Sequence, residues 1–253
     1  MSESSKNKSL LDHFHLGDRY ERKARLAPAL LSVVFLFPMV MAYGVATSSW
    51  ISTIVAGTGF SAVIAIGLSY LSSAMGNSFQ KQLWPNWPHD SPTNAWLRPD
   101  NHERSLQQKQ LWWSALKKLT SLDLEGVDPN DLELRLRIND AVGEIRARLS
   151  GTDSAKRLQR CNEDYGFARN FAGFRFFWLF FSAASVVGTW GAVFALQAEI
   201  IWAVLASLLL VFALFLDFAL LTPYVKSRAA QYAEAFFSAL MTLSNGVVDS
   251  EQE

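Results

Sequence analysis

The sequence has very little of what most catalytic and cross-linked sites are built from. One cysteine, Cys161, stands among 253 residues, which excludes an internal disulfide and a zinc site made of paired cysteines. We expect Cys161 to be a small buried hydrophobe. Net charge is also lacking, because 23 basic residues balance 23 acidic ones. A chain without an overall positive field gives no general argument for nucleic-acid binding.

Recognisable catalytic motifs are absent as well. The chain has no phosphate-binding glycine loop, no Gly-x-Ser-x-Gly elbow and no His-Glu-x-x-His zinc motif. Two polar clusters remain, "HFHLGD" (13–18) in the N-terminal tail and a loop group made of His89, Asp90, Asp100 and His102. A tail and a proline-rich loop collect polar residues in any case, so we expect no metal, no cofactor and no enzymatic activity.

Charge is missing from four long apolar stretches. Each has close to the roughly 20 residues that cross a bilayer as a helix. The first begins too late for a cleaved signal peptide and leads at once into the second. No strand pattern is convincing. We therefore predict an all-α membrane protein with two transmembrane hairpins, whose four spans cover residues 26–45, about 50–75, 176–196 and 200–221.

The lysines and arginines predict the orientation. Six precede the first span, fifteen lie between the second and third, two follow the fourth, and the short connections between paired spans have none. Because such residues are enriched on the cytoplasmic side, we expect both termini and the central segment there. The predicted parts are a basic N-terminal segment (1–25), hairpin 1 (26–75), a helical cytosolic domain (76–175), hairpin 2 (176–222), and a C-terminal cytosolic helix and tail (223–253).

The cytosolic domain is predicted to begin with a loop and to continue as three helices. Four prolines exclude a continuous helix over residues 83–100. The first helix falls within residues 102–122. The second is expected to start at Asp128, with Pro129 at its first position. The third starts near Asp153 and could run without a break into the third span.

The C-terminal segment is predicted to form a helix with one apolar face. Pro223 is expected to break or kink the chain before it. The apolar face requires a partner, which is either the cytosolic domain of the same chain or a neighbouring subunit.

Two features of the spans are relevant to function. Thr58, Ser61, Ser69 and Ser72 follow one another at helical spacing in the second span. Such a stripe either allows close helix packing or lines a water-filled pore shared among subunits. Asp217, an acid deep within the fourth span, must face protein or water. It either pairs with Arg175 or Lys226 or contributes to an acidic ring in an oligomeric pore.

Three segments carry a resemblance to a known family. They are "ERKARLAPALL" (21–31), "SPTNAWLRPDN" (91–101) and "NEDYGFARNFAGFR" (162–175). The chain resembles the four-span membrane effectors of bacterial anti-phage systems, such as the channel effectors of Hailong systems. The resemblance implies a homo-oligomeric ion channel of the inner membrane, for instance a tetramer, that is closed at rest. An oligonucleotide messenger made by a cognate nucleotidyltransferase would open it and depolarise the infected cell.

An oligodeoxyadenylate ligand requires arginines for its phosphates and aromatic rings for its bases. The candidates by this chemistry are Arg98, Arg169 and Arg175 with Trp96, Trp112, Trp113 and Tyr165. The pore candidates are Thr58, Ser61, Ser69, Ser72 and Asp217. The alternative function is a membrane scaffold or sensor that recruits a cytosolic partner and needs no pore.

Overall fold

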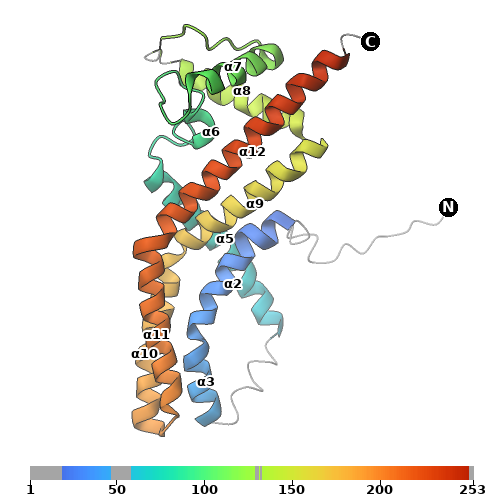
Figure 1. Ribbon diagram of the computed structural model, residues 1–253. Coiled ribbons are helices and arrows are strands. Elements are labelled where there is room, and N and C mark those ends of the chain that lie inside the picture. The colour runs from blue at the N-terminus through green and yellow to red at the C-terminus, as the bar shows by residue number, and fades with distance from the viewer. Residues whose placement is uncertain (1–18, 47–57, 129–130, 132, 251–253) are drawn as a thin grey trace, which may run out of the picture. The chain divides into compact units, whose positions relative to one another are not determined.

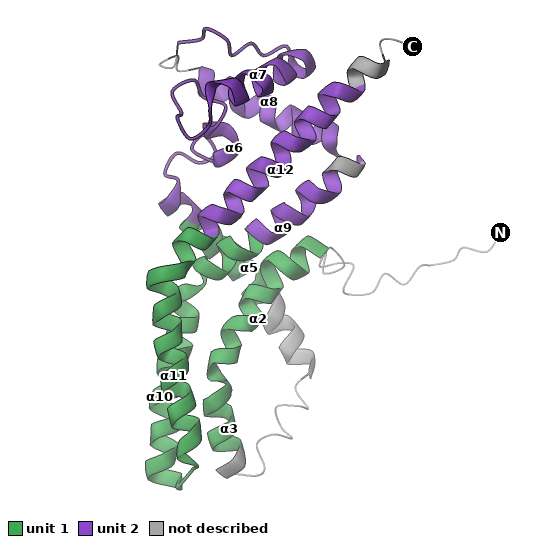
Figure 2. Ribbon diagram, viewed as in Figure 1, with its two compact units in different colours: residues 1–79, 166–224 green, residues 80–165, 225–253 purple. Residues whose placement is uncertain are grey.

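The computed structural model describes residues 19–46, 58–128, 131 and 133–250. Every regular element in these ranges is a helix, which confirms the all-α prediction (Figure 1). The chain divides into two compact units, shown in Figure 2. Unit 1 comprises residues 1–79 and 166–224, and unit 2 comprises residues 80–165 and 225–253. Three helices contribute residues to both units: α5 (Thr58–Leu83), α9 (Asp153–Gly173) and α12 (Leu221–Ser250).

Three helices of the described chain are long and apolar enough to cross a membrane, which marks the chain as a membrane protein. They are Glu21–Gly44, Arg175–Leu196 and the helix Ile200–Gly246. They coincide with the first, third and fourth predicted spans. The second predicted span, from about residue 50 to about residue 75, begins outside the described residues, and α5 covers its remainder. A fourth span therefore stays a prediction.

The first membrane helix departs from α geometry twice, each time just before a proline. The π-helical turn η1 (Glu21–Leu26) leads into α2 (Ala27–Val33), and the 3-10 turn η2 (Val34–Leu36) leads into α3 (Phe37–Ala46). Pro28 lies two residues after η1, and Pro38 two residues after η2. Proline has no N–H, so the carbonyl four residues earlier loses its donor and the preceding turn is rewound.

The fourth span shows the same effect at Pro223. Helix α11 (Ile200–Phe215) passes through the π-helical turn η3 (Leu216–Leu220) into α12. Of the two outcomes predicted at Pro223, the break is wrong, and the kink stays a prediction. The helix continues through Pro223, and the departure from α geometry lies just upstream, where the missing N–H of Pro223 leaves a carbonyl without its α-helical donor.

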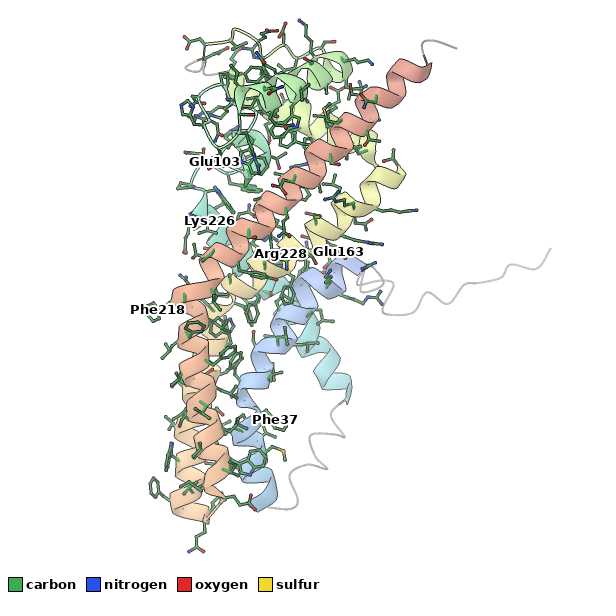
Figure 3. The ribbon with its side chains drawn as sticks, viewed as in Figure 1. Phe37, Glu103, Glu163, Phe218, Lys226 and Arg228 are labelled. Carbon is green, nitrogen blue, oxygen red and sulfur yellow. The ribbon has the colours of Figure 1, made fainter. Side chains whose placement is uncertain are left out.

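Hairpin 2 consists of α10 (Arg175–Leu196) and α11, joined at Gln197, whose φ of 54° ends α10 in the left-handed conformation. The hydroxyls buried in α10 bond within their own helix: Ser182 donates to the Trp178 carbonyl at 2.7 Å and Thr189 to the Ser185 carbonyl at 2.8 Å. Small buried side chains of this kind allow close helix packing. Large apolar side chains such as Phe194 are exposed and suit a lipid environment. Phe218 is another of them (Figure 3).

Two predicted helix boundaries in the central segment were wrong. Helix α8 (Leu134–Leu149) begins at Leu134 rather than Pro129, which itself lies outside the described residues. The side chain of Asp131 accepts from the Glu133 N–H at 2.9 Å, and this local turn competes with helix further upstream. Helix α9 does not run unbroken into the third span, because Phe174 (φ −81°, ψ 4°) separates α9 from α10.

The described residues of unit 2 form a hydrophobic core, built mainly from α7 (Leu106–Thr120), α8 and the unit-2 parts of α9 and α12. Leu116, Ile145 and Phe236 are completely buried in it, and Cys161 packs against it half-buried. The apolar face of the C-terminal helix therefore packs on the central segment of its own chain, within unit 2. The short helix α6 (Pro92–Ala95) lies in the loop before α7 and is capped by the Ser91 side chain.

Replacing Phe236 with alanine is expected to destabilise unit 2 by about 3–5 kcal/mol, because the change leaves a cavity in the only core that this unit has among the described residues. Limited proteolysis and thermal unfolding of the purified protein in detergent measure this. Phe218→Ala is the matched control, since this phenylalanine is 85% exposed. Equal loss of stability in both variants would show that α12 is not part of the core.

Candidate functional site at the helix junction of unit 1

Two helices of unit 1 approach each other at backbone distance. A Cβ placed on Gly173 of α9 would lie 2.4 Å from the Gly76 nitrogen of α5 and 2.5 Å from the Met75 carbonyl oxygen. A Cβ on Gly76 would lie 2.9 Å from the Asn170 Cα. Such an approach leaves no room for any side chain, so both positions require glycine.

The same stripe of α9 also contacts the first membrane helix. Gly166, Asn170 and Gly173 follow the spacing that places residues on one helix face. A Cβ on Gly166 would lie 2.8 Å from the Ala24 Cβ and 3.0 Å from the Tyr20 hydroxyl. We call Ala24, Gly76, Gly166, Asn170 and Gly173 the helix junction. Sequence reasoning missed the three α9 residues, although their spacing was the available signal.

Asn170 supplies the Ala24 carbonyl with a hydrogen bond that Pro28, which has no N–H, cannot donate. Its side-chain Nδ2 donates to the Ala24 carbonyl at 2.6 Å, and both residues are fully buried. In an α-helix the Ala24 carbonyl would accept from the N–H of residue 28, which is a proline here. Arg169 donates in turn to the Asn170 Oδ1 at 3.0 Å. The junction is thus held by one polar side chain inside a surround of small residues.

An ion pair lies at the beginning of hairpin 2. Arg175 Nη1 is 3.7 Å from Asp217 Oδ1, which is one of the pairings expected for this acid. The separation is longer than a hydrogen bond, and Asp217 Oδ1 accepts none, so the attraction is Coulombic. The Arg175 guanidinium also lies 5.2 Å from the Phe79 ring and 5.0 Å from the Phe176 ring. The pair joins α10 to the π-helical turn η3.

The hydroxyl stripe of α5 faces protein in a single copy of the chain, as far as its side chains are described. Ser69 is 5% exposed and Ser72 is completely buried. The Ser72 hydroxyl has no hydrogen-bond partner among the described residues. The side chains of Thr58 and Ser61 lie outside the described ones, as does the whole cluster at residues 13–18.

The tryptophans predicted to stack on bases form part of the core of unit 2. Trp96 stacks on Trp112 with ring centroids 6.3 Å apart, and Trp112 stacks on Phe237 at 3.8 Å. Trp113 donates its indole N–H to the Leu97 carbonyl at 2.9 Å. The three tryptophans are 3%, 6% and 8% exposed. Base stacking on them would require this core to open.

The remaining candidates are distributed between the units. Tyr165 of unit 2 is buried beside Trp84 and Trp87 and donates its hydroxyl to Gln80 at 2.9 Å. Arg169 and Arg175 belong to unit 1, whereas Arg98 and the tryptophans belong to unit 2.

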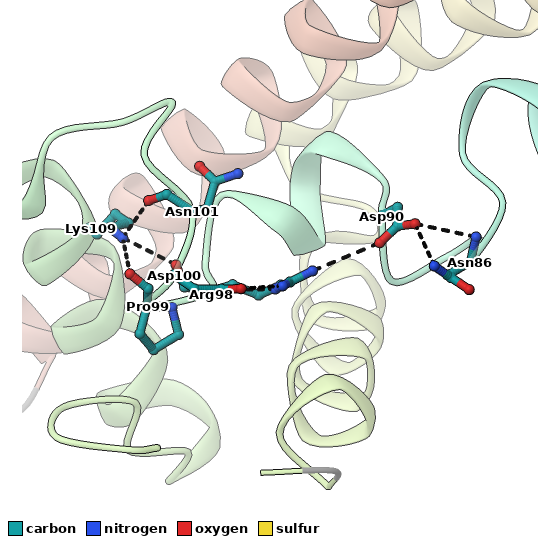
Figure 4. A network of polar contacts seen from close by, with 7 residues as sticks. All are labelled: Asn86, Asp90, Arg98, Pro99, Asp100, Asn101 and Lys109. Carbon is teal, nitrogen blue, oxygen red and sulfur yellow. Dashed lines mark hydrogen bonds and ion pairs between the residues drawn. The ribbon is translucent and has the colours of Figure 1, made fainter. Parts of the chain in front are cut away.

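Arg98 is engaged by two carboxylates in the loop before α7 (Figure 4). It hydrogen-bonds to Asp100 and lies 3.8 Å from Asp90. The hydrogen bond from Arg98 lowers the pKa of Asp100 below its usual value, although burial opposes the shift. A phosphate at Arg98 would have to compete with both acids. No described group of histidine, cysteine and acidic residues could hold a metal ion.

Lys109 organises this loop and was missed by sequence reasoning. It is 3% exposed, and its Nζ donates to the carbonyls of Arg98, Pro99 and Asn101 at 3.1, 3.0 and 2.8 Å (Figure 4). Desolvation lowers the pKa of Lys109, and the negative charge of Asp100 opposes this. The polar run that surrounds Lys109 in the sequence is typical of an exposed helix face, which concealed its role.

Comparisons with models of protein families, with curated proteins and with solved structures found no match.

Replacing Gly173 with alanine is expected to destabilise unit 1 by about 1–3 kcal/mol, because the new methyl group would overlap backbone atoms that cannot move independently. Gly67→Ala in α5 is the matched control. A Cβ on Gly67 meets nothing within 4 Å, and alanine is the better helix former by up to about 1 kcal/mol. Thermal unfolding in detergent should shift in opposite directions, and parallel shifts would contradict the close approach.

Asn170→Ala is expected to lower the free energy of unfolding by about 1–3 kcal/mol, because it removes the donor to the Ala24 carbonyl. The cost should be smaller when Pro28 is also replaced with alanine, since residue 28 then supplies an N–H. A double-mutant cycle of unfolding free energies measures this coupling. Additive effects of the two substitutions would show that Asn170 does not compensate for the proline.

Proposed function

We propose that the protein is a membrane effector in which unit 2 controls an ion pathway built from several copies of unit 1. The helix junction carries this proposal. It holds η1, α5 and α9 together at backbone distance, and α9 belongs partly to unit 2 and leads directly to α10. A change in unit 2 thus has a covalent route to the helices of hairpin 2.

The junction is suited to switching between two arrangements. Closely packed backbones and cores do not deform continuously, so a displacement of α9 tends to move the contact to a second discrete packing. The π-helical turns η1 and η3 mark places where a helix tolerates rewinding. The Arg175–Asp217 pair, whose groups are not hydrogen-bonded to each other, can be rearranged without losing a hydrogen bond.

The conducting path is proposed to form between subunits of a homo-oligomer such as a tetramer. The outward faces of α10 and α11 are apolar, and Ser69 and Ser72 are buried, which supports a closed state at rest. In the open state the stripe that includes Thr58, Ser61, Ser69 and Ser72, together with Asp217, would line the path. The opening ligand is proposed to be an oligonucleotide messenger on the cytosolic side, made by a cognate nucleotidyltransferase during phage infection of a bacterium.

The second candidate is a scaffold or sensor that recruits a cytosolic partner. The burial of Ser69 and Ser72 favours it, because these hydroxyls already have a packing role in a single copy. Four helices of one chain would then need no water-filled path, and a stable monomer in detergent would be expected.

Ion flux through liposomes that contain the purified protein is expected to rise when a short oligodeoxyadenylate is added. Asp217→Asn should change the ratio of cation to anion flux, because it removes the acid proposed for the pathway. Glu199→Gln is the matched control, since Glu199 is an exposed acid in the turn before α11. Absence of flux with and without the oligonucleotide would favour the scaffold.

A further inference from the structure

The turn between α8 and α9 carries an unusual concentration of positive charge in unit 2. Residues 146–160, "RARLSGTDSAKRLQR", contain five basic residues and one acid, in a chain whose net charge is zero. Leu149 and Leu158 anchor both sides of this turn in the core of unit 2. The five basic side chains are exposed: Arg146, Arg148, Lys156, Arg157 and Arg160. We call residues 146–160 the basic hairpin.

Two of these arginines have no role in holding the fold. Arg148 pairs with Glu144 at 2.5 Å, and the Arg146 guanidinium lies 5.5 Å from the Tyr232 ring. Arg157 and Arg160, by contrast, form no ion pair with any residue in the described part of the chain. They are three residues apart on α9 and therefore lie on neighbouring positions of one helix face.

The charges of α9 change sign along its first turns. Asp153 is the first residue of α9, and the exposed cations Arg157 and Arg160 follow it. The N-terminal end of a helix carries partial positive charge, which disfavours a cation such as Arg157 near it. A bound anion beside Arg157 would offset this repulsion, and the helix dipole would assist the binding.

The surroundings favour a soluble polyanion over a membrane surface. Hairpins that bind to a bilayer surface insert exposed apolar side chains among their cations. No large apolar side chain is exposed between residues 137 and 175 among those described. The uncharged residues near the turn that reach solvent include Ser150, Gly151 and Gln159, which are small or polar.

We propose that the basic hairpin, with Arg157 and Arg160 at its centre, binds the phosphodiester backbone of a single-stranded oligonucleotide. Guanidinium groups bind phosphates in a bidentate fashion, and neighbouring cations suit a ligand that repeats its charge along a chain. The inference rests on the proposed function for the class of ligand. It replaces the predicted tryptophan site of unit 2 with an exposed one.

The test is the affinity of the detergent-purified full-length protein for a fluorescein-labelled oligodeoxyadenylate, measured by fluorescence anisotropy at several salt concentrations. The double variant Arg157→Gln/Arg160→Gln is expected to weaken binding about tenfold or more and to reduce the salt slope by roughly 1.4, which corresponds to two lost phosphate contacts on a single strand. The charge-matched control, Lys81→Gln/Arg135→Gln, removes two exposed cations elsewhere in unit 2 and should bind like the wild type.

Three results would overturn the proposal. The first is no binding of the oligonucleotide by the wild-type protein, and the second is equal weakening of binding in the control variant. The third is unchanged oligonucleotide affinity in the double variant, together with loss of co-purified anionic lipid from that variant in native mass spectrometry. Thermal unfolding of each variant shows whether unit 2 is still folded. Failure of the proposed function is seen separately. Oligonucleotide binding that depends on Arg157 and Arg160 without ion flux would refute the channel and leave the binding site, whereas gating that survives in the double variant would refute only the site.

Discussion

Backbone polar groups inside a bilayer have no water to bond with, and this constraint governs the membrane helices of the protein. Each proline at residues 28, 38 and 223 removes one donor, and each follows a turn that is not α-helical. At Pro28 the consequence extends to another helix, because Asn170 donates to the carbonyl of Ala24. The need for that bond, together with the glycines around it, explains why α9 and the first membrane helix lie so close together.

Several buried polar groups elsewhere in the chain also form hydrogen bonds with nearby backbone carbonyls. The hydroxyls of α10 bond to carbonyls of their own helix, and Lys109 is enclosed by three carbonyls of one loop. Arg98 is matched by two acids. Arg157 and Arg160 differ from these groups, because they form no ion pair among the described residues. Trp96, Trp112 and Trp113, which sequence chemistry marks as base-stacking residues, are used for packing in the core of unit 2.

The sequence was sufficient for the helical class and for the three spans seen here, because long uncharged runs leave a chain few alternatives. It was insufficient where tertiary contacts decide. Phe174 interrupts the helix beside Gly173, where α9 lies against the backbone of α5, and no local pattern shows this. The side chain of Asp131 accepts a hydrogen bond from the Glu133 N–H just before α8, and α8 begins at Leu134 rather than at residues 128–129 as predicted. Trp112 and Trp113 were predicted to stack on bases because indole rings bind bases well, but both are buried. An aromatic ring that can stack on a base can equally pack in a core, so the residue type alone does not predict its burial.

The core of unit 2 combines residues 96–158 with residues 233–240, and hairpin 2 lies between them in the chain. Ribosomal synthesis therefore delivers the central segment long before the helix that completes its core. Until hairpin 2 has been inserted and the last helix has emerged, the apolar surfaces of α7 and α8 await their partner, a state that favours chaperone capture or aggregation. Membrane insertion of hairpin 2 thus comes before the folding of unit 2 is complete, and a ribosome that stops early releases a chain whose unit 2 lacks part of its core.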